Sequence, residues 1–349
     1  MLKNILWSLV SMIQIRDVVS LCDGVSGGQL ALKRNGILYR NYFASEIDKY
    51  CVKVTKKNFP NTKFIGDISS VDGTKYNEVD LLISGTPCQG FSNASAKKLN
   101  FDDPRSKLFF EFARILGEVK PIYFLLENVK MKKEWIQIIN DTISDIVGYP
   151  VEPYLVNSAV VSGQNRWRCY WTNLPFDNQI EDRGILFGDI LVDTKEDMLR
   201  PCEPRQIKNQ SLCRHVANAT DIRSNESTKR VYAPDGKCPT VTTMQGGHRE
   251  PKVLCGAYRG RYNADGSTSQ RLEIRQDGKT STLTTVQKDN VVTKNGMFYR
   301  KILPIESERL QTFDDNWTEG VSNSQRFKQM GNAFTVAVIE EILKPMMWK

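Results

Sequence analysis

Residues 79–92 read VDLLISGTPCQGFS, and this stretch decides how the rest of the chain is interpreted. The apolar run Val79–Ile83 predicts a buried parallel strand. Gly85 and Pro87 end that strand, which leaves Cys88 on a turn just past its carboxyl end, where open α/β sheets bind ligands. A thiol on such a turn is either a nucleophile or a small buried cysteine, and the loop alone does not separate the two.

Strand and helix signals alternate on both sides of this loop, which predicts an α/β domain. The first strand, Ile15–Leu21, leads into the turn CDGVSGG at 22–28 and then into a helix that begins at Gln29. A Gly-rich turn between a strand and a helix lets the backbone approach a nucleotide-like ligand. Because the turn has neither the GxGxxG pattern nor a Walker lysine, a structural tight turn is nearly as consistent with it.

Two acidic residues end the next two predicted strands. Glu46 follows Tyr42–Ser45, about twenty positions past the turn, where an acceptor for ribose hydroxyls belongs. After a helix over Lys49–Asn58, Asp67 follows the strand Lys63–Gly66. Together the two carboxylates indicate a crevice for a ribose and an adenine amino group, whereas either one alone is more often a helix N-cap.

A third carboxylate, Glu127, directly follows the predicted strand Ile122–Leu126, between helices expected over 106–117 and 132–147. A carboxylate after such an apolar run is costly to bury unless it is protonated or paired. Glu127 is therefore either a helix N-cap or a group that donates a proton to a ring nitrogen.

The strand expected over Val151–Val160 precedes the sequence QNRWRC at 164–169. With a strand period of two, Gln164, Arg166 and Arg168 share one face. Two arginines on one strand face are costly without an anionic partner, which favours a binding site over a solvated surface.

Composition excludes several classes of protein. The 349 residues contain no apolar run long enough for a membrane span. The N-terminal stretch resembles a signal peptide but lacks a cleavage site, so we expect a cytoplasmic protein with no membrane partner. Eight Cys without a CxxC pair, and only two His, indicate reduced thiols and no metal site.

The net charge of +8 is concentrated in one segment, because residues 200–299 hold 17 Lys and Arg against 9 Asp and Glu. A basic segment on a balanced body fits a polyanionic partner. Residues 175–299 also lose helical periodicity, which predicts a small β-rich lobe suited to a nucleic-acid groove. From Arg300 the α/β character returns, with helices expected over 304–313 and 335–343.

Taken in order, these motifs resemble those of the DNA (cytosine-5)-methyltransferases. The Gly-rich turn and the two acidic strand ends come first, followed by GTPCQ, ENV, QxRxR, RLQTF and GNAF at 85–89, 127–129, 164–168, 309–313 and 331–334. The match covers nearly the whole chain and is most similar to prokaryotic and phage members, while the catalytic half also resembles the eukaryotic de novo methyltransferases.

The resemblance implies a Rossmann-like class I fold that uses S-adenosylmethionine, with a smaller β-rich target-recognition domain. It implies four parts: an N-terminal extension over 1–14, a cofactor-binding catalytic domain over 15–174, the target-recognition domain over 175–299, and a return to the catalytic domain over 300–349.

The resemblance also implies a mechanism. Cys88 would attack C6 of a cytosine that has left the duplex. Glu127 would protonate N3, and Arg168 would hold O2, with Arg166 as a further catalytic residue. No metal is implied.

Further site residues follow from the resemblance. Glu46 would bind the ribose hydroxyls of S-adenosylmethionine, Asp67 the adenine amino group and Ile68 the adenine ring. The implied cofactor-binding residues are Cys22, Asp23, Gly24, Gly27, Glu46, Ile47, Asp67, Ile68, Pro87, Leu108, Asn332 and Phe334. The implied DNA contacts are Gln89, Ser92, Arg249, Arg259, Arg261 and Arg271, where the arginines as a group are more typical of phosphate contacts than of base contacts.

Three positions depart from the family pattern: Cys22 replaces a usual Phe, Ile47 an aromatic residue and Asp314 a usual Pro. The space left at Cys22 is compatible with a bulkier modified donor. The motifs are also compatible with a tRNA cytosine-5 methyltransferase and with a catalytically silent DNA-binding homologue. We expect a monomer that acts on double-stranded DNA, with a cognate restriction endonuclease as a candidate partner.

Overall fold

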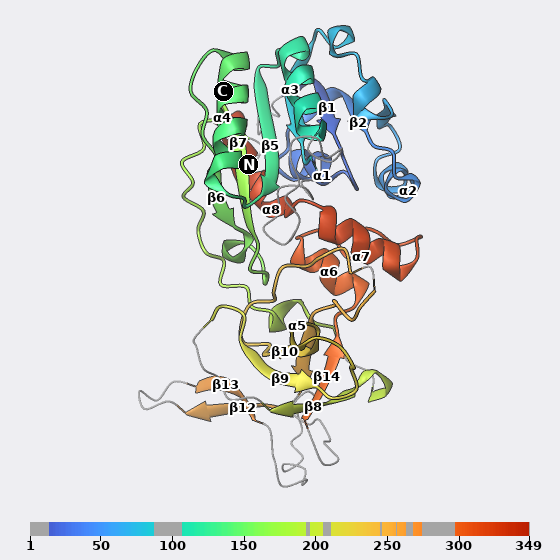
Figure 1. Ribbon diagram of the computed structural model, residues 1–349, viewed down its shortest axis with the longest axis vertical. Helices are drawn as coiled ribbons and strands as arrows, with labels where there is room; N and C mark the ends of the chain where they lie inside the picture. The colour runs from blue at the N-terminus through green and yellow to red at the C-terminus, as the bar shows by residue number, and fades with distance from the viewer. Residues whose placement is uncertain are drawn as a thin grey trace, which may run out of the picture.

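A seven-stranded β-sheet organises the first half of the chain (Figure 1). The computed structural model describes residues 14–86, 107–192, 196–204, 211–244, 246–255, 257–262, 268–273 and 297–348. The strands of this sheet are β1 (Gln14–Leu21), β2 (Leu38–Ser45), β3 (Lys63–Phe64), β4 (Val79–Ser84), β5 (Tyr123–Val129), β6 (Tyr154–Asn157) and β7 (Trp167–Thr172). They lie in the order β3-β2-β1-β4-β5-β7-β6. β1 to β5 are parallel, and β7 is antiparallel to both of its neighbours.

Helices cover both faces of the sheet, which explains why its central strands are apolar throughout. Neighbouring residues of β1 enter different cores: Val18 packs with α1 (Gly27–Arg34), α2 (Lys49–Asn58) and α8 (Val336–Leu343). Val19 packs instead with α3 (Lys107–Val119) and α4 (Lys133–Val147). All six residues of β4 are buried, as its sequence predicts.

A second β-structure follows in the chain. Five strands close into a small barrel in the order β10-β11-β14-β8-β9. These are β8 (Arg200–Pro204), β9 (His215–Ala219), β10 (Arg230–Tyr232), β11 (Lys252–Cys255) and β14 (Met297–Lys301), and the short helix α5 (Glu226–Lys229) precedes β10. A two-stranded hairpin is formed by β12 (Ala257–Tyr262) and β13 (Thr268–Glu273).

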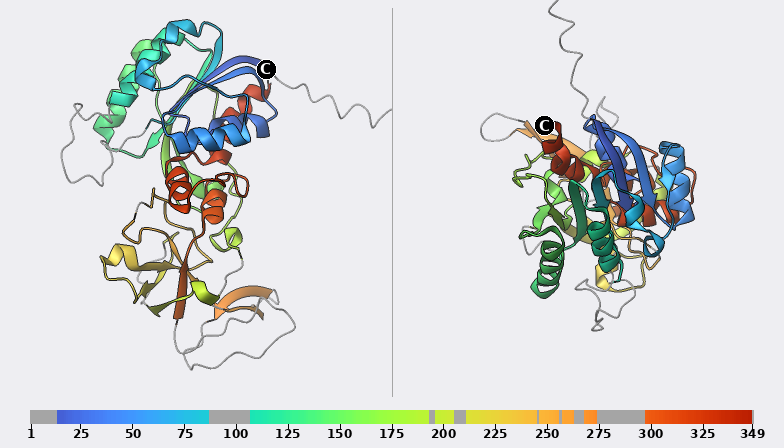
Figure 2. Two further views of the ribbon diagram at one scale, coloured as in Figure 1. Left: turned by 90° about the vertical axis from the view of Figure 1, so that its right-hand side faces the viewer. Right: turned by 90° about the horizontal axis from the view of Figure 1, so that it is seen from above.

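Two helices lie between the sheet and the barrel, α6 (Pro304–Leu310) and α7 (Asn323–Asn332), as both Figure 1 and the left view of Figure 2 show. Leu310 of α6 and Phe327 of α7 pack into the same cluster as Val241 and Val253 of the barrel region. A buried ion pair of 2.7 Å between Arg300 and Glu306 joins β14 to the start of α6. The barrel is therefore attached through packed side chains and not through a chain linker alone.

The predicted α/β fold is confirmed, and the helix expected over Lys49–Asn58 has those bounds. Some local expectations were wrong. Glu127 lies inside β5, because the strand continues to Val129 instead of stopping at 126. β6 covers only four residues of the predicted Val151–Val160, since a 3₁₀ turn begins at Ser158.

The strand at the paired arginines is also shorter than predicted. β7 begins at Trp167, so Gln164 and Arg166 precede it and only Arg168 lies within it. The prediction that three side chains share one strand face was therefore wrong. Helix α7 was not expected at all, because it contains Gly331 and few apolar residues.

Candidate active site

The end of β4 leads to the predicted nucleophile loop. Pro87, Cys88, Gln89 and Ser92 lie outside the described residues, which stop at Thr86. Thr86 is buried, and its hydroxyl lies 3.5 Å from the side-chain nitrogen of Asn128 on β5. The end of β4 therefore lies directly beside the ENV sequence of β5.

Glu127 and Arg168 form an ion pair across the ladder of β5 and β7. Arg168 Nε lies 3.1 Å from Glu127 Oε1, and both side chains are largely buried. That oxygen accepts no well-aligned hydrogen bond from the part of the chain that the structure describes. A buried carboxylate oxygen with an unfilled acceptor position is unusual, since buried polar atoms are normally hydrogen-bonded. The pair is thus arranged to take a further hydrogen-bonding partner.

Arg166 has a different environment from Arg168. It is 2% exposed, and its guanidinium donates to the carbonyl oxygens of Val241, Gly331 and Ala333 at 3.3, 3.3 and 3.0 Å. Burial, with a smaller contribution from the charge of Arg168, lowers its pKa to about 9, which leaves it charged at neutral pH. Arg166 therefore joins the barrel region to the end of α7, and its side chain acts on position more than on chemistry.

Gln164, the first residue of the same motif, is fully buried. Neither its amide nitrogen nor its amide oxygen has a hydrogen-bond partner among the described residues, and the same holds for Arg166 Nε. The backbone of Gln164 pairs with Cys238, so the motif lies against the barrel region.

The Gly-rich turn follows β1 and is held from within. Cys22 and Gly24 adopt left-handed backbone angles, with φ of 54° and 61°. The carboxylate of Asp23 is buried, accepting hydrogen bonds from Tyr42 Oη at 2.7 Å and from Ser26 Oγ, and burial raises its pKa. The Asp23 side chain therefore stabilises the turn internally. Because its carboxylate is occupied in this way, its predicted cofactor contact would have to come from its backbone.

Glu46 closes the turn on its other side. Its Oε2 accepts the N–H of Gly24 at 2.8 Å, and its Oε1 accepts the N–H groups of Ile47 and Asp48 at 2.8 and 2.7 Å. Burial raises the pKa of Glu46, and these N–H groups oppose the rise. The N-cap of α2 is Asp48, so the N-cap interpretation of Glu46 is wrong. Ile47 is 74% exposed, an apolar side chain beside the carboxylate.

The remaining acidic residue, Asp67, is exposed after β3. Its Oδ1 accepts the N–H and the hydroxyl of Ser69, and the backbone bond lowers its pKa. Asp67 is therefore the N-cap of a 3₁₀ turn. Because both hydrogen bonds are accepted by Oδ1, they leave Oδ2 unused. Burial raises the pKa of Cys22 to about 12, and the charges of Glu46 and Asp67 add to the rise.

The other predicted cofactor residues differ in burial. Ile68 is 4% exposed and Leu108 is half-buried, and both pack in the core on the α3 side. Phe334 is buried against two glycines: a Cβ at Gly85 would lie 2.6 Å from its ring, and one at Gly27 would lie 3.5 Å away. Asn332, at the end of α7, is exposed. Phe334 thus bridges the Gly-rich turn and the end of β4.

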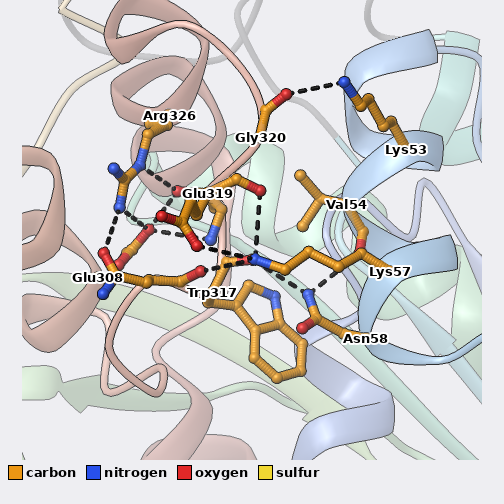
Figure 3. Close-up of polar contacts among 11 residues, drawn as sticks. Lys53, Val54, Lys57, Asn58, Glu308, Trp317, Glu319, Gly320 and Arg326 are labelled. Carbon is orange, nitrogen blue, oxygen red and sulfur yellow. Dashed lines mark hydrogen bonds and ion pairs between the residues drawn. The ribbon is translucent and has the colours of Figure 1, made fainter.

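Contacts from the C-terminal segment hold the turn and α2, and the sequence analysis missed them. Lys328 of α7 pairs with Asp48 at 2.7 Å, and Trp317 Nε1 donates to the carbonyl of Val25 at 3.0 Å. In Figure 3, Lys53 and Lys57 of α2 reach the backbone carbonyls of the loop at 316–320. Separations of more than 250 residues give no local signal for such pairs.

The predicted DNA contacts lie in or beside the barrel. Arg249 is exposed, on a loop fixed by the buried Lys252, whose Nζ donates to the carbonyls of His248 and Glu250 at 2.8 and 3.1 Å. Backbone register places Arg259 opposite Arg271 in the hairpin, and Arg261 is two positions along. The side chains of these three arginines lie outside the described residues.

Comparison with known proteins identifies the family. The model of the C-5 cytosine-specific DNA methylases matches residues 16–348. This chain belongs to that family. It is therefore a DNA (cytosine-5)-methyltransferase, whose substrate is DNA.

Curated relatives agree with this family. The enzyme is 30% identical to the type II methyltransferase M.NlaX of Neisseria lactamica, over 94% of this chain and 95% of the relative. It is 30% identical to the type II methyltransferase M1.ScrFI of Lactococcus lactis subsp. cremoris, over 95% and 77%. It is 29% identical to the orphan methyltransferase M.SPBetaI of Bacillus phage SPbeta, over 94% and 97%.

Solved structures share the fold. An Entamoeba histolytica methyltransferase, EhMeth, has a TM-score of 0.64 at 16% identity, covering 95% of this chain and 98% of that one. A DNA modification methyltransferase from an Escherichia coli prophage has a TM-score of 0.57 at 20% identity, covering 94% and 97%. Within the described residues, no helix has the length and apolar character of a membrane span, and no group of His, Cys, Asp and Glu is suited to a metal ion.

Proposed function

We propose that the enzyme methylates C5 of a cytosine extruded from a specific sequence in double-stranded DNA, through a transient bond between Cys88 Sγ and C6. The observation that carries the proposal is the buried Glu127–Arg168 pair at 3.1 Å, beside the strand that leads to Cys88. A carboxyl group and a guanidinium together match the N3 and O2 edge of a cytosine, and Glu127 Oε1 accepts no well-aligned hydrogen bond among the described residues.

The chain's own residues can carry the proton and bond changes. Attack by the Cys88 thiolate forms the S–C6 bond, while a proton from Glu127 reaches N3 and Arg168 holds O2. C5 becomes nucleophilic as a result. Once C5 carries the methyl group, loss of the C5 proton to water, cleavage of the S–C6 bond and return of the N3 proton to Glu127 restore the aromatic ring and free the thiolate. A thiolate suits both steps because it adds and leaves readily.

S-adenosylmethionine fits the turn at the ends of β1 to β3, and when bound it supplies the electrophilic methyl group. Glu46 would hold the ribose hydroxyls, since its carboxylate is fixed by three backbone N–H groups at 2.7–2.8 Å and keeps further acceptor positions. Asp67 would accept the adenine amino group on its second oxygen. Ile68 would contact the adenine ring, with Ile47 exposed beside Glu46 as a further cofactor-binding residue.

We further propose that residues 175–299 form the target-recognition domain, with 15–174 and 300–349 as the catalytic domain. The barrel, the basic excess and the exposed Arg249 support this role. The protein would act as a monomer in the cytoplasm of a bacterial or phage-infected cell. A cognate restriction endonuclease remains a candidate partner, which relatives named as type II methyltransferases support.

Bisulfite-type sequencing of DNA from cells that express the enzyme tests the proposal. We expect 5-methylcytosine at one recurring sequence, and loss of this signal with Cys88→Ser while DNA binding persists. Methylated tRNA with unmodified DNA would contradict the proposed substrate. Mass spectrometry of the product nucleoside checks the transferred group, because a modified donor would leave a group larger than methyl.

A further inference from the structure

Trp167 is an exposed aromatic residue beside the candidate active site. It is the first residue of β7 and is 42% exposed, although tryptophan is usually well buried. Its neighbour Arg168 is ion-paired with Glu127, and the Arg168 guanidinium also donates to the Trp167 carbonyl at 2.8 Å. The indole therefore lies at the end of the β5–β7 ladder, on the opposite face of the strand from the Arg168 side chain that meets Glu127.

A lysine is already placed against this indole. Lys130 Nζ lies 5.4 Å from the centroid of the Trp167 ring, within the range of a cation–π contact. Lys130 directly follows β5, and the register Val129–Arg168 sets it at the same end of the ladder as Trp167. The indole and the ammonium group thus form one surface at the carboxyl end of β5, three residues past Glu127 in the chain.

This surface carries positive charge that the described residues do not neutralise. Lys130, Lys132 and Lys133 are all exposed, and none forms an ion pair with a carboxylate in the part of the chain that the structure describes. A purely structural tryptophan would have its ring buried, whereas that of Trp167 is 42% exposed.

We propose that Trp167 and Lys130 bind the DNA strand at the nucleotide adjoining the extruded cytosine, an inference that rests on the proposed function. The indole packs on the base or sugar of that nucleotide, and Lys130 pairs with its phosphate. Aromatic stacking on a base and phosphate neutralisation are the two contacts by which proteins hold unpaired nucleic acid. Removing a base from the stack exposes both groups at this position.

The chain provides matched controls at the opposite edge of the sheet. Lys120 is exposed and precedes β5 at its amino end, whereas Lys130 follows its carboxyl end. Tyr149 is 44% exposed and follows α4, which runs back from the site. Lys120→Gln and Tyr149→Ala therefore remove the same kinds of group far from the proposed contact.

The test compares Trp167→Ala and Lys130→Gln with these two controls. It uses full-length protein and an unmethylated duplex that contains the sequence the enzyme methylates. The dissociation constant for DNA should rise roughly 5- to 100-fold in Trp167→Ala, while Trp167→Phe keeps most of the affinity. In Lys130→Gln, the slope of log K against log salt should fall by about 1. The affinity for S-adenosylmethionine should not change.

DNA affinities and salt slopes equal to those of the controls would overturn the inference. Because Lys130 is exposed, its replacement should leave the fold intact. The dependence of DNA affinity on salt in Lys130→Gln therefore tests the inference even if Trp167→Ala is unstable. Binding is measured directly, so the result does not depend on turnover. If the wild type methylates DNA while both variants behave like the controls, the inference fails and the proposed function stands.

Discussion

Two clusters at the carboxyl edge of the sheet differ in whether their polar side chains have hydrogen-bond partners. The turn cluster consists of Gly24, Glu46, Asp48 and Lys328, and the arginine cluster of Glu127, Gln164, Arg166 and Arg168. In the turn cluster, both oxygens of Glu46 accept backbone N–H groups, and Asp48 accepts both Tyr50 N and Lys328 Nζ. In the arginine cluster, buried atoms of Glu127, Gln164 and Arg166 have no partner among the described residues.

This difference fits the proposed function, in which the turn cluster is ordered before the cofactor binds and the arginine cluster is completed by the substrate. A carboxylate fixed by backbone N–H groups has a set position, so a small cofactor pays little for ordering it. Buried groups without partners cost free energy in the empty protein, and that cost is recovered when a substrate supplies the missing hydrogen bonds. Such an arrangement suits a base that must first leave its duplex.

The largest expected effect is that of Glu127→Gln. The amide keeps the shape of the side chain but does not supply an acidic proton, so kcat should fall by about 10²- to 10⁴-fold. Unfolding temperature and cofactor affinity should stay near the wild-type values. The matched control is Glu134→Gln, an exposed position in the first turn of α4. Wild-type turnover in Glu127→Gln would contradict the role given to the arginine cluster.

Replacement of Arg166 should act on stability instead. Arg166→Ala leaves three carbonyl oxygens without their donor and opens a cavity, which should cost about 3 kcal/mol of unfolding free energy. Arg166→Lys keeps the charge and should recover part of the loss. Urea unfolding measures both, with Arg168→Ala as the comparison. Arg168→Ala also costs stability because Glu127 loses its partner, but it should lower kcat far more than Arg166→Lys does. Equal losses of kcat in Arg166→Lys and Arg168→Ala would remove the distinction between the two arginines.

The smallest effect is expected in the turn cluster. Lys328→Ala removes the partner of Asp48 and frees the segment that carries Glu46, so KM for S-adenosylmethionine should rise by about 2- to 5-fold, as expected for a half-exposed ion pair. Neither kcat nor KM for DNA should change, and Lys328→Arg should restore the wild-type value. A raised KM for S-adenosylmethionine with unchanged kcat and unchanged KM for DNA would identify Lys328 as a positioning residue. A change in KM for DNA would instead indicate that α7 couples the two clusters.

Local sequence was a good guide where one signal dominates. The helix over Lys49–Asn58 follows from its Asp48 cap and its apolar spacing, and the buried strand Val79–Ser84 from its apolar run. The motif order also located Glu127 and Arg168, which the structure pairs at 3.1 Å. Prediction failed at Arg166 and Gln164, because strand periodicity was extended to residues that precede β7.

Helix α7 shows why the remainder could not be predicted. Its sequence NSQRFKQMGN has few apolar residues and a glycine, so its own propensity is poor. Tertiary contacts hold it: a Cβ at Gly331 would lie 2.4 Å from the backbone of Thr242, and Gln311 Nε2 donates to the carbonyl of Met330 at 2.8 Å. Only glycine permits that approach to the barrel region.

By itself the sequence determined the family, the α/β alternation and the acidic and basic residues to which the chemistry is assigned in the proposed function, because these depend on residue type and order along the chain. The tertiary structure decided which arginine meets Glu127, which one joins the barrel region to α7, and which lysines fix the cofactor turn. Those outcomes depend on contacts between residues far apart in sequence, where burial and hydrogen-bond geometry give each charge its role.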